Sequence, residues 1–76
     1  MSYEIRLRRA AQKGLDVLPE GDYRTVAKAV SSLQENPRPP RIKKLADSGL
    51  WRIRVGQYRV VYAIDDVSRT ATIVRV

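Results

Sequence analysis

The chain contains no cysteine and no histidine, and only 8 of its 76 residues are acidic. The missing cysteines exclude a disulfide framework and a thiolate metal site. The missing histidines remove the usual general base and the commonest zinc ligand. No apolar run approaches the length of a membrane span, and the first residues lack the apolar stretch of a signal peptide. We therefore expect a cytoplasmic protein without a metal or other cofactor.

Lysine and arginine are abundant: 15 of them against 8 acids give a net charge of +7 and a pI near 10.4. The hydrophobic fraction of 43% is high enough for a folded core, and the length fits one small domain over residues 1–76. So strong a basic bias predicts affinity for a nucleic acid or for an acidic protein partner.

The stretch 49–62 predicts a β-hairpin. Apolar and basic residues alternate with period two on both sides of Gly56 and Gln57, which indicates two strands joined by a two-residue turn with positive φ at Gly56. The turn then sets the cross-strand pairs, which are Trp51 with Tyr62, Ile53 with Val60, Arg54 with Arg59, and Val55 with Tyr58. One face of the hairpin is thus apolar, and the other carries three arginines, at 52, 54 and 59. Arginines that face each other repel, so this face favours a bound polyanion.

Two helices are predicted before the hairpin. The first begins at Arg9 and ends before Pro19, and the second begins with Asp22 as its N-cap and ends at Asn36 and Pro37. Apolar stripes at helical spacing indicate that both helices pack on a sheet, and these stripes contain Ala11, Leu15 and Leu18 in the first and Tyr23, Val26, Ala27, Val30 and Leu33 in the second. A stiff extended connector follows over 37–41.

Strand patterns occupy the rest of the chain. They predict a first strand over 3–8, a short strand-like piece over 42–45, and a last strand over 70–76 that completes a meander with the hairpin. The predicted fold class is α+β: an N-terminal strand, a two-helix hairpin, and a three-stranded antiparallel meander with the helices on one sheet face. If Tyr62 opposes Val74, Arg75 joins the arginine face. If Tyr62 opposes Ile73, Arg75 points toward the core, which is costly for a charge, so we expect the first register.

Known catalytic motifs are missing from the sequence. It has no phosphate-binding glycine loop, no Ser-His-Asp set and no metal-ligand cluster, and the adjacent Asp65 and Asp66 are typical of a turn. Clustered arginines can bind phosphate bidentately and stabilise charge on phosphorus during attack by an RNA 2′-hydroxyl. Such a reaction needs a base and an acid. Without histidine the candidates are a lysine or arginine with a shifted pKa, or a tyrosine, and the sequence leaves these open.

The hairpin and the strand after it resemble the RelE branch of the RelE/ParE toxin superfamily. The likeness covers nearly the whole chain, and its most specific part is the Gly-x-Tyr-Arg-x-x-Tyr pattern that starts at Gly56. The resembling segments are Leu45, the stretch 49–62, Ile64-Asp65-Asp66 and Val74-Arg75-Val76. The resemblance implies the RelE-like microbial RNase fold and a toxin of a type II toxin–antitoxin pair. It further implies an mRNA interferase that cleaves messenger RNA in the ribosomal A site without a metal.

The resemblance also implies roles for single residues. Arg59 matches a catalytic arginine that stabilises the transition state, and Arg52 and Arg54 match basic residues around the scissile phosphate. Lys43 and Lys44 lie near positions that contact RNA, and Arg75 is expected to bind RNA beside them. The implied partners are a cognate antitoxin and mRNA on the ribosome, with contacts to 16S ribosomal RNA.

One departure from the family concerns the end of the chain. Family members usually continue with an arginine-rich stretch and a tyrosine, whereas this sequence stops at Val76. We therefore expect weak or no RNA cleavage by the 76-residue form, with the fold and antitoxin binding retained. The alternatives are a ParE-like inhibitor of DNA gyrase, which needs no catalytic residues, and a non-catalytic remnant that only binds an antitoxin.

Overall fold

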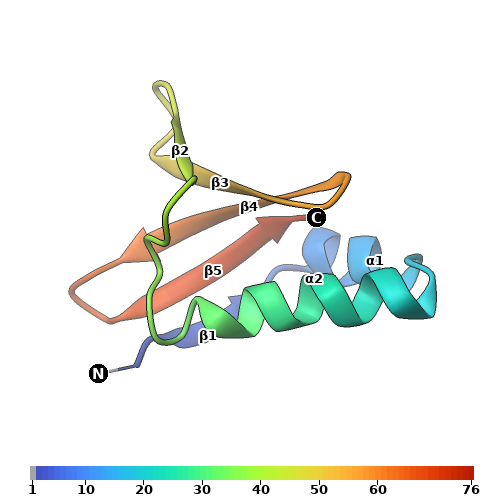
Figure 1. Ribbon diagram of the computed structural model, residues 1–76. Helices are drawn as coiled ribbons and strands as arrows, with labels where there is room; N and C mark the ends of the chain where they lie inside the picture. The colour runs from blue at the N-terminus through green and yellow to red at the C-terminus, as the bar shows by residue number, and fades with distance from the viewer. Residues whose placement is uncertain (1) are drawn as a thin grey trace.

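Five strands and two helices follow one another along the chain in the computed structural model, which describes residues 2–76 (Figure 1). The elements are β1 (Glu4–Leu7), α1 (Arg9–Asp16), α2 (Glu20–Ser32), β2 (Lys43–Leu45), β3 (Leu50–Val55), β4 (Tyr58–Asp65) and β5 (Thr70–Arg75). All the strands form one sheet with the order β1-β5-β4-β3-β2. The predicted α+β fold class and the meander of β3, β4 and β5 are confirmed.

The two remaining strands extend the meander at its edges. β2 pairs antiparallel with β3, and β1 pairs parallel with β5 in the register Glu4 to Thr70. A parallel pair needs a long crossover connection, and here the crossover includes both helices. The sequence pattern predicted that these two segments are strands. It did not predict their partner strands, because neither pairing has a local sequence signal.

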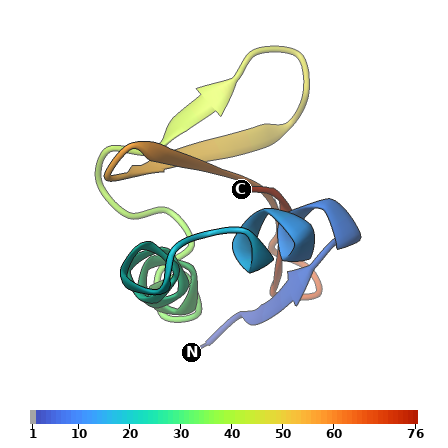
Figure 2. The ribbon, with the colours of Figure 1, turned by 90° about the vertical axis from the view of Figure 1, so that its right-hand side faces the viewer.

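Both helices pack against the sheet, as predicted. α2 is seen end-on beside the strands in Figure 2, and the β2–β3 end of the sheet projects beyond the helices. The residues of the buried core come from both helices and from β3, β4 and β5; they are Ala11, Leu15, Val26, Val30, Leu33, Val55, Val60, Tyr62 and Ile73. Neither helix within residues 2–76 has the length and hydropathy needed to cross a bilayer.

The boundaries of α2 differ from the prediction. The helix begins at Glu20 behind Pro19, so Asp22 lies in its first turn and is not the N-cap. It ends at Ser32, four residues before Asn36, and a turn covers the intervening residues. Proline at the N-cap needs no donor there, which allows the early start. The shift directs the Asp22 carboxylate toward the hairpin.

The β3–β4 hairpin has the predicted register. Arg54 lies opposite Arg59 and Val55 opposite Tyr58, and Gly56 has a φ of 60°. Glycine adopts such a φ without a steric penalty, which accounts for its place in the turn.

The register of β5 differs from the prediction. Tyr62 lies opposite Ile73, and Val61 lies opposite Arg75, so Val74 is the extra residue of a β-bulge. A bulge shifts the alternation of side chains by one residue. Arg75 still lies on the arginine face, as expected, although the register is different. The bulge pairs it with Val61, whose side chain points to the same side as that of Arg59.

The connector over 37–41 is not simply extended. It turns at Pro40 and Arg41, and Arg41 has a φ of 78°. Pro37 is buried, and its carbonyl oxygen accepts a hydrogen bond of 2.7 Å from the hydroxyl of Tyr62. The connector is therefore packed on the sheet, and it places Arg41 beside β2.

Candidate nucleic-acid interface

The sheet face that points away from the helices collects positive charge. Arg52 and Arg54 on β3 share this face with Arg59 on β4 and Arg75 on β5. Lys43 joins them because it lies opposite Arg52 in the β2–β3 pair. Together with Arg41 of the connector, these side chains form what we call the basic face; its six members are Arg41, Lys43, Arg52, Arg54, Arg59 and Arg75.

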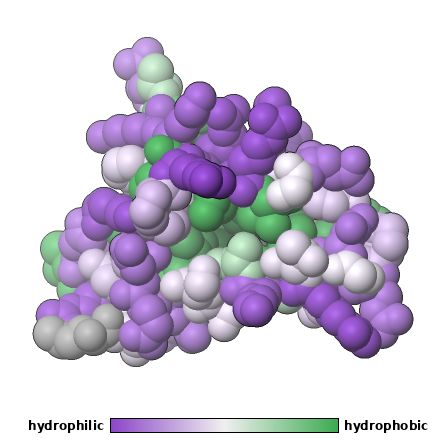
Figure 3. Space-filling model, viewed as in Figure 1, coloured by the Kyte–Doolittle hydropathy of each residue, from purple (hydrophilic) through white to green (hydrophobic). Residues whose placement is uncertain are grey.

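Two hollows divide the basic face. The first has a volume of about 360 Å³ and is lined only by basic residues and a glycine, namely Arg41, Lys43, Arg52, Arg54 and Gly56. The second, of about 480 Å³, includes Arg52, Arg59 and Arg75 in its lining. Arg52 belongs to both hollows, so it lies where they meet. Figure 3 shows hydrophilic side chains gathered over β2 and β3, and apolar ones over the sheet between β3 and α2.

None of the six basic-face side chains forms an ion pair within residues 2–76. Ion pairs of the described chain involve other cations, among them Arg6, Arg24 and Arg38. Six cations that converge without an acid repel one another, and a bound polyanion relieves this repulsion. Guanidinium groups suit phosphate because their planar forks donate two parallel hydrogen bonds.

Arg41 is the basic-face member that the sequence reasoning missed. Its left-handed φ of 78° is uncommon for a residue other than glycine, and such strain is often found at functional sites. Its place between two prolines and a short strand suggested only a linker. The sequence feature that could have identified Arg41 is the positive charge of the connector, and not its predicted extended conformation.

Lys44 does not extend the basic face. It lies opposite Trp51 in the β2–β3 pair, and its Nζ is 5.7 Å from the centre of the indole ring. Neighbouring residues of a strand point to opposite faces, so Lys43 and Lys44 are separated by the sheet. On the Lys44 side, Arg38 also lies over Trp51, at 5.5 Å.

The four tyrosines direct their hydroxyl groups away from the basic face or hold them in other contacts. Tyr62 is buried, which raises its pKa to about 12. Tyr58 donates to Asp22 and Tyr3 donates to Asp66, and each hydrogen bond raises the pKa of its tyrosine. Tyr23 is an exposed residue of α2 on the helix side. These contacts offer no tyrosinate as a base for RNA on the basic face.

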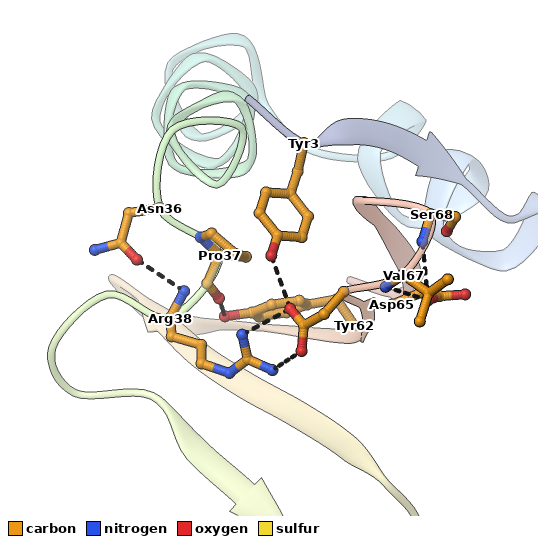
Figure 4. A network of polar contacts seen from close by, with 9 residues as sticks. Tyr3, Asn36, Pro37, Arg38, Tyr62, Asp65, Val67 and Ser68 are labelled. Carbon is orange, nitrogen blue, oxygen red and sulfur yellow. Dashed lines mark hydrogen bonds and ion pairs between the residues drawn. The ribbon is translucent and has the colours of Figure 1, made fainter. Parts of the chain in front are cut away.

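A polar network joins the connector to the β4–β5 turn (Figure 4). The Arg38 guanidinium donates to both carboxylate oxygens of Asp66, at 3.0 and 2.9 Å, and the Tyr3 hydroxyl donates to the same carboxylate at 2.7 Å. These two donors, Arg38 first, lower the pKa of Asp66 to about 2. Asp65 shapes the turn, as predicted, because its carboxylate accepts from the amides of Val67 and Ser68. No group of three or more acidic residues within 2–76 is arranged to hold a metal ion.

The hydrogen bonds of Asp66 predict that the stability of the fold depends on pH in the acidic range. Because the folded pKa of Asp66 is depressed, its contribution is present above its ordinary pKa of 3.8 and is lost as the pH falls through about 2. Asp66→Asn should therefore lower the free energy of unfolding at pH 5 and reduce the loss of stability between pH 4 and pH 2. Urea unfolding at pH 5, 3 and 2 measures this change.

The control for this prediction is Asp47→Asn, at an exposed turn aspartate without an ion pair within 2–76. An Asp66→Asn variant with the wild-type acid dependence would contradict the assignment of this network.

Comparison with known proteins places the chain among toxins. Residues 5–76 match the model of the family described as "ParE toxin of type II toxin-antitoxin system, parDE". A comparison with functionally curated protein sequences gives no match.

Solved structures of RelE proteins share the fold. The archaeal RelE–RelB complex from Pyrococcus horikoshii OT3 matches with a TM-score of 0.87 and 28% identity over 99% of this chain and 92% of the other. The RelBE2 toxin–antitoxin complex from Mycobacterium tuberculosis matches with a TM-score of 0.87 and 29% identity over 99% and 95%. The isolated E. coli RelE toxin has the same fold, with a TM-score of 0.84 at 20% identity over 97% and 81%. With its family match over residues 5–76, the chain belongs to the ParE toxin family of type II toxin–antitoxin systems, within the RelE/ParE superfamily.

Proposed function

We propose that this toxin is an endoribonuclease that binds and cleaves messenger RNA at its basic face. The observation that supports this is the convergence of six cations, none of which has an ion-pair partner within residues 2–76. A surface of this kind is suited to the phosphates of a nucleic acid, which dominate the affinity of such complexes.

The proposed reaction needs no metal ion. The 2′-oxygen of the nucleotide before the cut attacks the adjacent phosphorus, and the bond from phosphorus to the 5′-oxygen breaks. The products are a 2′,3′-cyclic phosphate and a 5′-hydroxyl, while one proton leaves the 2′-hydroxyl and another reaches the 5′-oxygen. We assign Arg59, Arg54 and Arg52 to the charge that builds on the phosphoryl oxygens, and Lys43, Arg75 and Arg41 to neighbouring phosphates.

Proton transfer limits the rate in this proposal. The chain has no histidine, and the tyrosine hydroxyls are hydrogen-bonded elsewhere or lie on the helix side. General acid–base catalysis by a positioned side chain contributes on the order of 10² to 10⁴ in rate, so cleavage is slow unless a lysine or arginine of the basic face takes part in proton transfer.

Two kinds of partner follow from the proposal. The first is mRNA on the ribosome, where 16S ribosomal RNA offers further phosphates to the basic face. The second is a cognate antitoxin, because one matched structure is described as a RelE–RelB complex and another as the toxin–antitoxin complex RelBE2. An acidic antitoxin segment is complementary in charge to a chain with a net charge of +7.

The test uses programmed ribosomes and a matched pair of messages. One mRNA is all-ribose, and the other has a single 2′-deoxynucleotide before the mapped cleavage position. We expect the toxin to cut only the first and to leave a 2′,3′-cyclic phosphate, detected because alkaline phosphatase cannot remove it until mild acid has opened the ring to a monophosphate. Cleavage of the deoxy-substituted message, or products with a 3′-hydroxyl and a 5′-phosphate, would refute the proposed mechanism.

Inhibition of DNA gyrase is the second candidate function, and the ParE description of the matched family favours it. A protein-directed inhibitor does not need clustered phosphate ligands, so we place it second. A gyrase supercoiling assay with the same protein preparation separates the two functions. Inhibition that persists in Arg59→Ala, with no cleavage of ribosome-bound mRNA by the wild type, would favour the gyrase function.

A further inference from the structure

The tip of the β3–β4 hairpin is tied to helix α2 by a hydrogen bond between side chains. The hydroxyl of Tyr58, the first residue of β4, donates to Oδ2 of Asp22 in the first turn of α2 at 2.6 Å. The side-chain amide of Gln57 donates to the Tyr58 hydroxyl oxygen at 3.3 Å. Asp22 and Tyr58 also line a hollow of about 280 Å³ between the helix and the turn.

The hairpin tip has little other support. β5 pairs with β4 only from Asp65 back to Val61, so residues 58–60 have no β5 neighbour on that side. Within the tip, Arg54 and Arg59 lie opposite each other, and two like charges in this arrangement destabilise a sheet. The apolar anchors of the tip are Val55 and Val60, which are buried in the core. A tip of this kind needs a polar tie to keep one geometry.

The tie acts through the strand and not directly on a ligand. Tyr58 points to the helix face, and the next residue, Arg59, points to the basic face. Asp22 therefore lies across the sheet from the arginines. A restraint on Tyr58 would reach Arg59 through the backbone that the two residues share, and Arg54 through Val55, which lies opposite Tyr58.

We infer that the Asp22–Tyr58 hydrogen bond is a positioning latch, which holds the hairpin tip so that Arg54 and Arg59 are preorganised for phosphate. This inference rests on the proposed RNA function of the basic face. Asp22 is a positioning residue on the helix side of the sheet. Tyr58 also contributes to the lining of the second hollow, and its positioning role comes from the hydrogen bond to Asp22. Preorganised donors lose no free energy to reorganisation when the ligand binds, so loosening the tip weakens the interaction without removing any basic group.

Three variants separate the latch from other roles. Tyr58→Phe and Asp22→Ala remove the hydrogen bond, and Asp22→Asn removes the charge but keeps an oxygen that accepts from the Tyr58 hydroxyl. Tyr23→Phe is the matched control, since it removes a hydroxyl from an exposed tyrosine of the same helix. Ile5→Val, on β1 far from the hairpin in the sheet order, controls for a mild loss of stability.

RNA affinity, single-turnover cleavage and amide hydrogen exchange are measured for each variant well below its unfolding transition. We expect Tyr58→Phe and Asp22→Ala to lose about tenfold in RNA affinity and in cleavage, and their Val55 and Tyr58 amides to exchange about tenfold faster, the scale of one lost hydrogen bond to a charged group. Asp22→Asn should rescue both properties to near the wild-type values. Tyr23→Phe and Ile5→Val should leave the tip exchange and the RNA affinity unchanged.

Several outcomes would overturn the latch. Wild-type tip exchange in Tyr58→Phe shows that the bond does not hold the tip. Faster exchange with unchanged RNA affinity shows that the tip does not position the arginines. Loss of cleavage in Asp22→Asn with wild-type exchange and affinity shows that Asp22 acts as a proton acceptor instead. If the wild type does not bind RNA at all, the proposed function fails and the positioning role fails with it, while the exchange data still decide whether the bond holds the tip.

Discussion

Replacing Arg59 by alanine is expected to slow cleavage of ribosome-bound mRNA on the order of 100-fold, the cost of removing one preorganised donor to a developing oxyanion. Arg59 lines the same hollow as Arg52 and Arg75, and it lies opposite Arg54 in the hairpin. It is thus surrounded by other arginines of the basic face. In the proposed mechanism, a donor in this place stabilises the transition state more than the bound substrate. The single-turnover rate should therefore fall much more than the RNA affinity.

Two further variants make this result specific. Arg59→Lys keeps the charge but loses the planar fork, so it should recover only part of the rate. Arg24→Ala removes the same charge from the exposed surface of α2, where Arg24 pairs with Glu20, and should cleave like the wild type. Equal losses in Arg24→Ala and Arg59→Ala would mean that net charge, and not the position of Arg59, drives the reaction.

A steep dependence on salt is the second large effect that we expect. If all six basic-face cations contact phosphates, the slope of log affinity against log salt for single-stranded RNA is about −4, so affinity falls roughly 300-fold between 50 and 200 mM salt. Titration of a labelled oligonucleotide by fluorescence anisotropy over this range measures the slope.

Adjacent lysines supply the matched control for the salt experiment. Lys43 belongs to the basic face, and Lys44 lies on the opposite face over Trp51. Lys43→Ala should make the slope shallower by about 0.7, whereas Lys44→Ala should leave it unchanged. An equal effect of the two substitutions would show that RNA does not distinguish the faces of the sheet.

The arginine hairpin shows what a local pattern can predict. Period-two alternation around Gly56 fixed both the strand register and the face of Arg52, Arg54 and Arg59, because a two-residue turn leaves one way to pair its strands. The same reasoning failed at β5. Residues 70–76 are rich in β-branched side chains on both faces, so nothing local marks the bulge at Val74.

Other features depend on partners that are distant in the sequence. Lys44 looked equivalent to Lys43 until its pairing with Trp51 assigned it to the other face. The ion pair between Arg38 and Asp66 joins residues 28 positions apart, in segments that predicted only a linker and a turn. Asp22 predicted a helix cap, and the early start of α2 behind Pro19 gave it a tyrosine partner instead. In each case tertiary packing, not local propensity, decided the outcome.

The parallel pairing of β1 with β5 has a consequence for the timing of folding. Glu4 pairs with Thr70, so the first strand waits for almost the whole chain before its partner exists. Synthesis at roughly 5 to 20 residues per second leaves β1 unpaired for several seconds on the ribosome. Contacts this distant in sequence also slow the search itself. The sheet is therefore complete only after β5 has emerged from the ribosome. Until then the β3–β4 hairpin lacks the folded domain that supports its arginines.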